Sequence, residues 1–253
     1  MSALDRFRLD GRVAVVTGAS SGLGAGFALA LAEAGADLVL AARRLDRLHE
    51  LACRLAETGA AVEVVAADVA DPEDCERVAA AAVDRFGRLD VLVNNAGLGT
   101  AVPALKETPD GFRQVLDVNL HGAFWMAQAC AARMSPGSSV VNVASVLGVI
   151  APRYPQAAYA ASKAGLIGLT RDLAGEWSRR RGIRVNALCP GYFDSEMTAG
   201  EGGELRTMVE QQSMLGRFGE QHELDTAMLF LASPASTYVT GTTLLVDGGL
   251  SSY

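Results

Sequence analysis

The residue types that could perform acid–base chemistry gather in one stretch, where an apolar run passes into a helical pattern rich in small residues. Ser145 ends the apolar run, and Tyr159 precedes Lys163 by four positions. Positions i and i+4 share a helix face, so the Tyr159 phenol and the Lys163 ammonium are expected to lie side by side. A free tyrosine has a pKa of about 10, and a cation within about 4–6 Å lowers that pKa by stabilising the phenolate. The pattern therefore predicts a general acid/base that exchanges a proton with an alcohol or carbonyl oxygen.

Lysine usage separates this pair from an ordinary pair on a helix surface. Of the 22 basic residues in the chain, only Lys106 and Lys163 are lysines. A tyrosine and a lysine at this spacing are therefore expected by chance far less than once. Lysine supplies a compact, rotatable charge that the planar fork of arginine does not reproduce. The pair is interpreted as functional.

Composition restricts the class of protein. The chain has 253 residues, half of them hydrophobic, and a formal net charge of −7, which disfavours nucleic acid or an anionic membrane as a partner. No run reaches the ~18 apolar residues of a membrane span, and the charged first ten residues lack the apolar core of a signal peptide. The four cysteines lack CxxC spacing, so neither a zinc site nor a disulfide framework is indicated. These features predict a reduced, cytoplasmic protein without a metal.

Apolar β-rich runs alternate with helical patterns along almost the whole chain. The expected strands are Arg12–Thr17, Asp37–Ala42, Val62–Ala67, Leu89–Asn94, Ser138–Ala144, Ile183–Cys189 and Thr243–Val246. The expected helices lie near 22–34, 45–58, 72–86, 108–133, 156–180 and 220–232. The strands are continuous Val/Leu runs, as expected when helices cover both faces of a sheet. We therefore predict one α/β domain over residues 1–253, with a doubly wound parallel sheet of about seven strands and helices on both faces.

The first expected strand runs directly into a glycine-rich loop, Gly18 to Gly24, and then into a helix. Glycines allow a sharp turn and a close approach to a pyrophosphate, and the helix N-terminus offers free N–H groups and the positive end of the dipole. The spacing is GxxxGxG rather than GxGxxG, and glycines in such a turn also serve packing alone. Because the loop follows the first strand of an α/β pattern, nucleotide binding is favoured.

Two arginines follow the second expected strand. Ala42 ends this strand, and Arg43 and Arg44 come next, with no acidic residue before Asp46. An acidic residue at this place would bind a ribose 2′-hydroxyl, whereas arginine accommodates a 2′-phosphate. We expect NADP(H) to be preferred over NAD(H), with a solvated helix start as the alternative role of the two arginines.

Polar residues also follow the third and fourth expected strands. Asp68 and Val69 follow the third, and the run 94–97 closes the fourth, where open α/β sheets place ligands. The same residue types favour turns. Asn119 lies in a long apolar helical pattern, where a polar amide is more often a satisfied core or kink residue than a catalyst.

The ordered set of these motifs resembles the short-chain dehydrogenase/reductase family. The resemblance extends from about residue 10 to 250, and the matching motifs are Thr17–Gly24, Asn94–Gly97, Asn119, Ser145, Tyr159-x-x-x-Lys163, Pro190-Gly191 and Thr240–Gly249. It implies a Rossmann-type fold and a nicotinamide-dependent oxidoreductase, in which the cofactor supplies the hydride.

The resemblance also implies roles for individual residues. Tyr159 would exchange a proton with the substrate oxygen, and Lys163 would lower the pKa of Tyr159 and bind the nicotinamide ribose. Ser145 would hydrogen-bond the reacting oxygen, and Asn119 would hold a water that links Lys163 to solvent. The implied cofactor contacts are Gly18, Ser20, Ser21, Gly22, Leu23, Gly24, Arg43, Arg44, Asp68, Val69, Asn95, Ala96, Gly97, Pro190, Gly191 and Ser195.

The chain departs from the family pattern at three places. Ser145 precedes Tyr159 by 14 residues, one more than in most relatives, and the extra residue falls in the loop 151–155 beside the expected site. Ser195 replaces a threonine that usually follows Pro-Gly and keeps a hydroxyl for the nicotinamide amide. The glycine-rich loop lacks the basic residue often found before its second glycine, which leaves Arg43 as the main expected contact of a 2′-phosphate.

Substrate choice is expected to depend on residues 192–219, with 151–155 and 98–104. Within 192–219, the glycine-rich and acidic run 194–204 fits either a mobile lid or a solvated loop. The resemblance leaves two branches of the family open, the sugar dehydrogenases and the acyl-carrier-protein reductases. Gly175 stands where relatives that dock a carrier protein often have arginine, and this counts mildly against the second branch.

Helices near 115–132 and 156–175 are apolar nearly all round, which predicts a homo-oligomer. The family resemblance implies a homodimer or homotetramer packed through these helices.

The leading hypothesis is an NADP(H)-dependent oxidoreductase that acts on a small-molecule carbonyl or secondary alcohol. One alternative is an NAD(H)-dependent sugar or alcohol dehydrogenase of the same family. A second is a catalytically silent NADP-binding sensor, which would be expected to lose Tyr159 or Lys163. A third is a nucleotide-sugar epimerase or dehydratase, against which the chain length and the glycine spacing count.

Overall fold

Seven parallel strands form one sheet in the computed structural model, which describes residues 2–151, 154–194 and 202–252. The strands are β1 (Val13–Thr17), β2 (Asp37–Ala42), β3 (Val62–Ala66), β4 (Val91–Asn94), β5 (Ser139–Val143), β6 (Arg184–Pro190) and β7 (Thr243–Val246). Their order is β3-β2-β1-β4-β5-β6-β7, so the direction of winding reverses between β1 and β4. In open parallel sheets, ligands bind at the carboxyl ends of the strands beside such a reversal.

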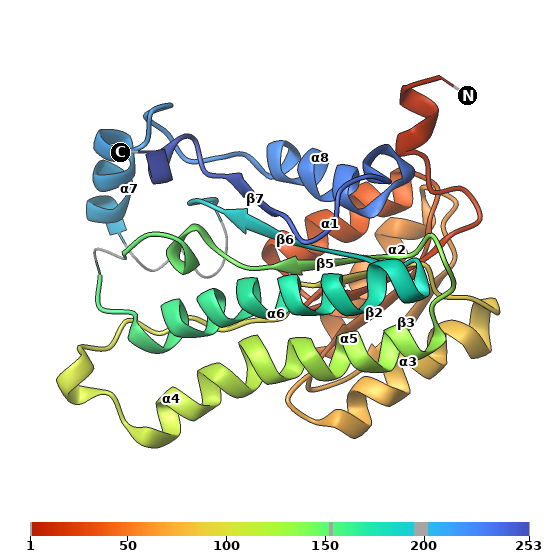
Figure 1. Ribbon diagram of the computed structural model, residues 1–253, viewed down its shortest axis with the longest axis horizontal. Coiled ribbons are helices and arrows are strands. Elements are labelled where there is room, and N and C mark those ends of the chain that lie inside the picture. Colours follow the sequence, from red (N-terminus) through yellow and green to blue (C-terminus); the bar gives the residue numbers. More distant parts are fainter. Residues whose placement is uncertain (1, 152–153, 195–201, 253) are drawn as a thin grey trace.

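Helices cover both faces of the sheet (Figure 1). On one face lie α1 (Gly22–Glu33), α2 (Leu45–Ala56) and α8 (Gln221–Ala232). On the other lie α3 (Pro72–Phe86), α4 (Pro109–Leu116), α5 (Gly122–Arg133) and α6 (Ala157–Arg181). A further helix, α7 (Gly202–Gln212), stands at the end of the molecule near the C-terminus (Figure 1). Short 3₁₀ helices occur at Leu4–Phe7, Ala104–Lys106, Val146–Gly148, Pro234–Ser236 and Leu250–Ser252.

Burial on both faces explains the unbroken apolar runs of the strands. Every residue of β1 is buried. Ala14 and Val16 pack into the core beneath α1 and α8, whereas Val13 and Val15 pack into the core beneath α3 and α5. A strand that is covered on both faces gains nothing from polar alternation. The predicted doubly wound parallel α/β fold is therefore confirmed.

Two helical segments differ from the expected pattern. The stretch 108–133 is not one α-helix, because the π-helical turn Asp117–His121 separates α4 from α5. Residues 202–212 form α7, which was not among the expected helices. Leu205 and Val209 bury one side of α7 against Phe218, and this tertiary contact favours helix in a segment that begins with two glycines.

The longest helix is α6, with 25 residues. Across the described part of the chain, no helix is long and apolar enough to cross a membrane.

Candidate active site

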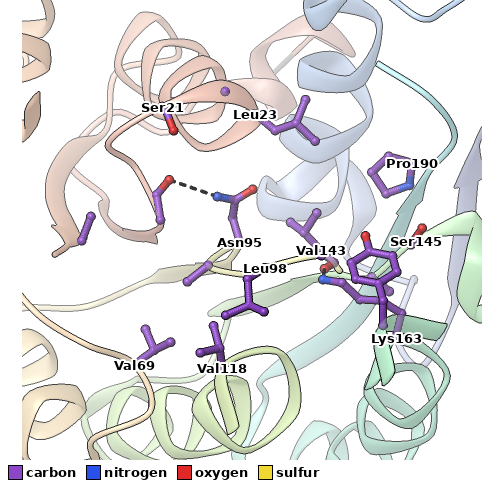
Figure 2. A pocket seen from close by; sticks show the side chains of 18 of the residues that line it. Ser21, Leu23, Val69, Asn95, Leu98, Val118, Val143, Ser145, Lys163 and Pro190 are labelled. Atoms are coloured by element: carbon purple, nitrogen blue, oxygen red, sulfur yellow. Dashed lines mark hydrogen bonds between the residues drawn. The ribbon is translucent and has the colours of Figure 1, made fainter. Parts of the chain in front are cut away.

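A cavity of about 530 Å³ lies at the carboxyl ends of the strands. It receives side chains from the loops that follow β1, β2, β3, β4, β5 and β6, and from the start of α6. The expected site residues that line it are Gly18, Ser20, Ser21, Gly22, Leu23, Arg43, Arg44, Asp68, Val69, Asn95, Ala96, Gly97, Ser145, Tyr159, Lys163, Pro190 and Gly191. Figure 2 shows Ser21 at one end of this cavity and Ser145 with Lys163 at the other. The fold thus brings together residues from nearly the whole chain.

Three expected site residues are not among those that line the cavity. Gly24 and Asn119 lie behind its wall, and Ser195 falls outside the described residues. Conversely, Val118, Val143 and Gln156 line the cavity without having been expected to, whereas Phe193 belongs to the segment 192–219 that was expected to govern substrate choice. A signal for Val143 was available, since it ends the buried β5 two residues before Ser145.

The end of β5 and the first turns of α6 bring together Ser145, Tyr159 and Lys163, the residues expected to be catalytic, and we call this part of the cavity the catalytic corner. Lys163 is only 4 % exposed, and its Nζ donates a 2.7 Å hydrogen bond to the Val143 carbonyl. The same Nζ lies 5.7 Å from the centre of the Tyr159 ring. Ser145 is anchored by the turn that follows β5, where its Oγ accepts a 3.1 Å hydrogen bond from the Leu147 N–H. The i, i+4 spacing on α6 therefore places the phenol and the ammonium side by side, as expected.

Burial controls the acidity of this corner. Burial raises the pKa of Tyr159 above its ordinary value of 10, and a hydrogen bond with the Ser145 side chain opposes this rise. Burial also lowers the pKa of Lys163 from 10.5 to about 8. The direction for Tyr159 is opposite to the one expected from the lysine charge alone. The physical reason is that loss of water around the partly buried phenol disfavours the phenolate.

Asn119 occupies the π-helical turn Asp117–His121 and is 1 % exposed. Its Oδ1 accepts a 2.8 Å hydrogen bond from Leu98 N–H, and its Nδ2 donates to Leu98 O at 2.9 Å and to Ser162 Oγ at 3.0 Å. The amide is thus a satisfied residue at a kink, and it fastens the loop after β4 to α6. A Cβ on Gly97 would lie 3.3 Å from Asn119 Oδ1 and 3.6 Å from Lys163 Nζ, so these two groups face the same small space.

The glycine-rich loop depends on its glycines for conformation and for space. Gly18 has φ +64° and Gly22 has φ +52°, both in the left-handed region. A Cβ on Gly18 would lie 2.8 Å from Ala96 Cα, and one on Gly24 would lie 2.5 Å from Gly18 O. Gly24 therefore acts in packing within the loop.

Thr17 and Asn95 join the glycine-rich loop to the loop after β4. The Oγ1 of Thr17 accepts hydrogen bonds from the N–H groups of Asn95 and Ala96, each at 3.0 Å. The Asn95 amide donates to the carbonyls of Thr17 at 3.0 Å and Gly18 at 3.3 Å. Figure 2 shows Asn95 between the two loops.

Arg43 and Arg44 both line the far end of the cavity, but their contacts differ. Arg44 Nη2 donates to Ser21 Oγ at 2.6 Å and to Ser20 Oγ at 3.0 Å. Arg43 is exposed and forms no ion pair with a described residue. On the opposite side, Asp68 N–H donates to Asp74 Oδ2 at 2.8 Å, and Asp68 Oδ1 accepts from Ala70 N–H at 3.0 Å. Arg44 thus braces the loop, while Arg43 presents a guanidinium at the cavity rim.

Pro190 and Gly191 connect the cavity to the C-terminal part of the chain. A Cβ on Gly191 would lie 2.7 Å from Asp247 Cα, so the residue after β6 must be small. The Asp247 carboxylate accepts hydrogen bonds from Gly249 N–H at 3.0 Å and Ser251 N–H at 2.9 Å. These contacts around Asp247 are what the C-terminal motif Thr240–Gly249 contributes to the structure of the site.

Comparison with known proteins defines the family. The model of a family described as enoyl-(acyl carrier protein) reductase matches residues 18–251. A galactitol 2-dehydrogenase (L-tagatose-forming) from Cereibacter sphaeroides is 44 % identical over 250 residues, which are 96 % of either chain. The structure of a short-chain dehydrogenase/reductase from Serratia marcescens superposes with a TM-score of 0.91 and 35 % identity, over 96 % of this chain and 99 % of that one. The structure of a gluconate 5-dehydrogenase from Burkholderia cenocepacia, in complex with NADP and tartrate, gives a TM-score of 0.93 and 38 % identity over the full length of both chains. The chain belongs to the short-chain dehydrogenase/reductase family and is an oxidoreductase of that family.

Proposed function

We propose that this protein is an NADP(H)-preferring oxidoreductase that transfers a hydride between the nicotinamide cofactor and a carbonyl or secondary alcohol. Tyr159 is the general acid/base of this reaction. The observation that carries the proposal is the cavity itself. One end holds Ser145, Tyr159 and Lys163, and the other end holds the glycine-rich loop with Arg43.

The cavity residues fit a dinucleotide. Positive φ at Gly18 and Gly22 turns the backbone beneath the start of α1, and the N-cap residue Ser21 forms no side-chain hydrogen bond with the N–H groups of this helix. The N–H groups of the first helical turn are then available to a pyrophosphate. Gly18, Ser20, Gly22 and Leu23 would hold the pyrophosphate and its ribose. Asp68 and Val69 would flank the adenine, and Pro190 and Gly191 would hold the nicotinamide end. When bound, the cofactor supplies or accepts the hydride.

The catalytic corner handles the proton. In the direction of reduction, Tyr159 donates its proton to the substrate oxygen, which the Ser145 hydroxyl orients. A tyrosine whose pKa is raised is fully protonated at neutral pH and is therefore ready to act as the acid. Lys163, with a pKa of about 8, is mostly charged at pH 7 and stabilises the phenolate that is left. We further propose that the space between Asn119 and Lys163 holds the water through which the proton is replaced.

The preference for NADP(H) rests on the difference between the two arginines. Arg44 is bonded to Ser20 and Ser21, whereas Arg43 offers an exposed guanidinium at the cavity rim. Arg43 is therefore the residue proposed to bind the 2′-phosphate, in a bidentate manner that suits phosphate. The NADP bound in the structure of the Burkholderia cenocepacia gluconate 5-dehydrogenase supports this proposal.

Parallel fluorescence titrations with NADPH and NADH test the proposal. We expect at least a tenfold preference for NADPH, about 1.4 kcal/mol. Arg43→Ala should remove most of this preference, and Arg54→Ala, near the far end of α2, is the matched control. An equal loss of affinity for NADPH and NADH in Arg43→Ala would show that Arg43 does not bind the 2′-phosphate. Failure to bind either nucleotide would overturn the whole proposal.

The name of the Cereibacter sphaeroides relative favours a second candidate, an NAD(H)-dependent sugar or alcohol dehydrogenase. Tighter binding of NADH, together with oxidation of a polyol, would establish that candidate instead. Tight NADPH binding without turnover of any carbonyl in a broad panel would point to a silent NADP-binding sensor.

We also propose that the protein is a homodimer or homotetramer. The outward face of α6 carries the small residues Ala161, Ala164 and Gly168, and a Cβ on Gly168 would meet nothing within 4 Å. Such a face allows a second helix to approach closely. Light scattering at micromolar concentration is the test, and a mass of 26.4 kDa would refute the proposal.

A further inference from the structure

A second cavity of about 500 Å³ lies beside the catalytic corner. It shares Leu147 and Tyr192 with the first cavity, so the two meet at these residues. Ile150 from the segment after β5, Met208 from α7 and Leu250 from the C-terminal 3₁₀ helix supply further walls. Three segments distant in sequence therefore enclose one space.

The second cavity begins next to the reacting groups. Leu147 is held to Ser145 by the hydrogen bond between its N–H and the serine Oγ. Leu147 and Leu250 belong to one buried apolar cluster, against which Tyr159 and Tyr192 also pack. A substrate whose oxygen lies between Ser145 and Tyr159 would therefore have this apolar cluster within reach of the next atoms of its chain.

Among the described residues, the side chains that line the second cavity carry no charge. Of these eight described side chains, five are aliphatic or methionine, one is Tyr192, and two are the amides Gln211 and Gln212. At the catalytic end of the first cavity, the one charged group among the described lining residues is the Lys163 ammonium. This ammonium already donates a hydrogen bond to the Val143 carbonyl. A carboxylate or phosphate on the substrate would lose water here without gaining a cation from the described lining residues.

We infer that the substrate is an uncharged ketone or secondary alcohol with an apolar alkyl or aryl arm, and that this arm occupies the second cavity. The inference rests on the proposed oxidoreductase function and assigns its substrate class. Met208 of α7 is the specificity-determining residue of the arm. The amides of Gln211 and Gln212 can form hydrogen bonds with one polar group on the arm.

The direct test compares ketones of increasing length. The value of kcat/KM should rise by about fourfold for each methylene from 2-butanone to 2-octanone, the increment expected when a methylene leaves water. A polyhydroxylated ketone such as L-tagatose should fall below an alkyl ketone of the same carbon count. A flat or falling series, or a faster reaction of the sugar, would overturn the inference.

Variants on α7 locate the arm. Met208→Trp should fill the second cavity, so that kcat/KM for 2-octanone falls at least tenfold while that for 2-butanone stays within about twofold. Thr207→Trp is the matched control, because Thr207 is exposed on the same helix and lines neither cavity. Ala151→Trp fills the cavity from the opposite wall and replaces Met208→Trp if that variant does not fold. Equal losses for the short and the long ketone would overturn the placement.

Calorimetry with unreactive amides separates this inference from the proposed function. The affinity for butanamide, hexanamide and octanamide should rise with chain length in the wild-type protein and not in Met208→Trp. If no ketone is turned over but this rise is observed, the proposed function fails and the apolar-arm site stands. If ketones are turned over but the amides bind equally, the oxidoreductase function stands and the inference is overturned.

Discussion

Lys163→Met should stabilise the fold while it abolishes turnover, because the buried ammonium is kept for chemistry at the expense of stability. Burial moves the pKa of Lys163 from 10.5 to about 8, and each tenfold change in acidity corresponds to about 1.4 kcal/mol. Keeping the charged form in the folded protein at pH 7 therefore costs about 3 kcal/mol. Methionine has a similar shape without the charge, but it leaves the Val143 carbonyl without its donor, a loss of about 1–2 kcal/mol. The net gain at pH 7 is about 1–2 kcal/mol.

The difference in stability between the wild-type protein and Lys163→Met should change with pH in a defined direction. The folded pKa lies below the unfolded value of about 10.4, so the unfolded chain binds more protons between pH 8 and pH 10.4. Raising the pH through this window stabilises the wild-type protein relative to the variant. The advantage of Lys163→Met should therefore be greatest below pH 8 and should shrink by about 2 kcal/mol between pH 7 and pH 9.5.

Urea unfolding without nucleotide, at one protein concentration and at pH 7 and 9.5, measures the effect. Lys106→Met is the matched control, since Lys106 is the other lysine of the chain and is exposed. Its free energy of unfolding should differ from the wild-type value by less than about 0.5 kcal/mol at both pH values. The reasoning is refuted if the difference between wild type and Lys163→Met does not change with pH, or if the variant is clearly less stable at pH 7.

Three further outcomes are expected. Tyr159→Phe should lower kcat by at least about 10²-fold and leave the Kd for NADPH within about twofold, as measured by steady-state kinetics and fluorescence titration; retained turnover would remove Tyr159 as the proton donor. Gly18→Ala should destabilise the protein by about 1–3 kcal/mol more than Gly11→Ala in urea unfolding. The two glycines have similar φ, +64° and +68°, but of the two only Gly18 has a close backbone neighbour. Equal losses of stability in the two variants would show that the close approach is unimportant. Arg44→Ala should weaken NADPH and NADH binding alike, because it releases the serines of the loop, whereas a loss confined to NADPH would give Arg44 the phosphate-binding role proposed for Arg43.

Much of the architecture and the site follows from local patterns in the sequence. The Val/Leu runs that alternate with helices predicted the parallel sheet, since a strand buried on both faces must be apolar throughout. The Tyr159–Lys163 spacing predicted the paired side chains, because i and i+4 lie on one face of any α-helix. The glycine-rich loop and the two arginines were predicted to lie at the carboxyl ends of β1 and β2, and they line the cavity there. These features depend on neighbours in sequence.

Other features depend on contacts between distant segments, and only the tertiary structure decided them. The direction of the Tyr159 pKa shift follows from burial, which outweighs the opposing hydrogen bond with Ser145, a residue 14 positions away in the chain. The different contacts of Arg43 and Arg44 follow from which guanidinium meets Ser20 and Ser21 across the β1–β2 edge. The π-helical turn at Asn119 is fixed by its bonds to Leu98 and Ser162.

The helix α7 and the second cavity are the clearest case of this division. Residues 202–212 form a helix because Leu205 and Val209 meet Phe218, and Met208 then faces Ile150 and Leu250 across a space that no sequence window contains. The sequence by itself therefore determined the fold, the pairing of Tyr159 with Lys163 and the glycine-rich loop that we propose binds the nucleotide, because short-range periodicity and backbone geometry encode them. Tertiary packing decided the acidity of the catalytic groups and the shape beside them, because both are sums over segments that meet only in the folded chain.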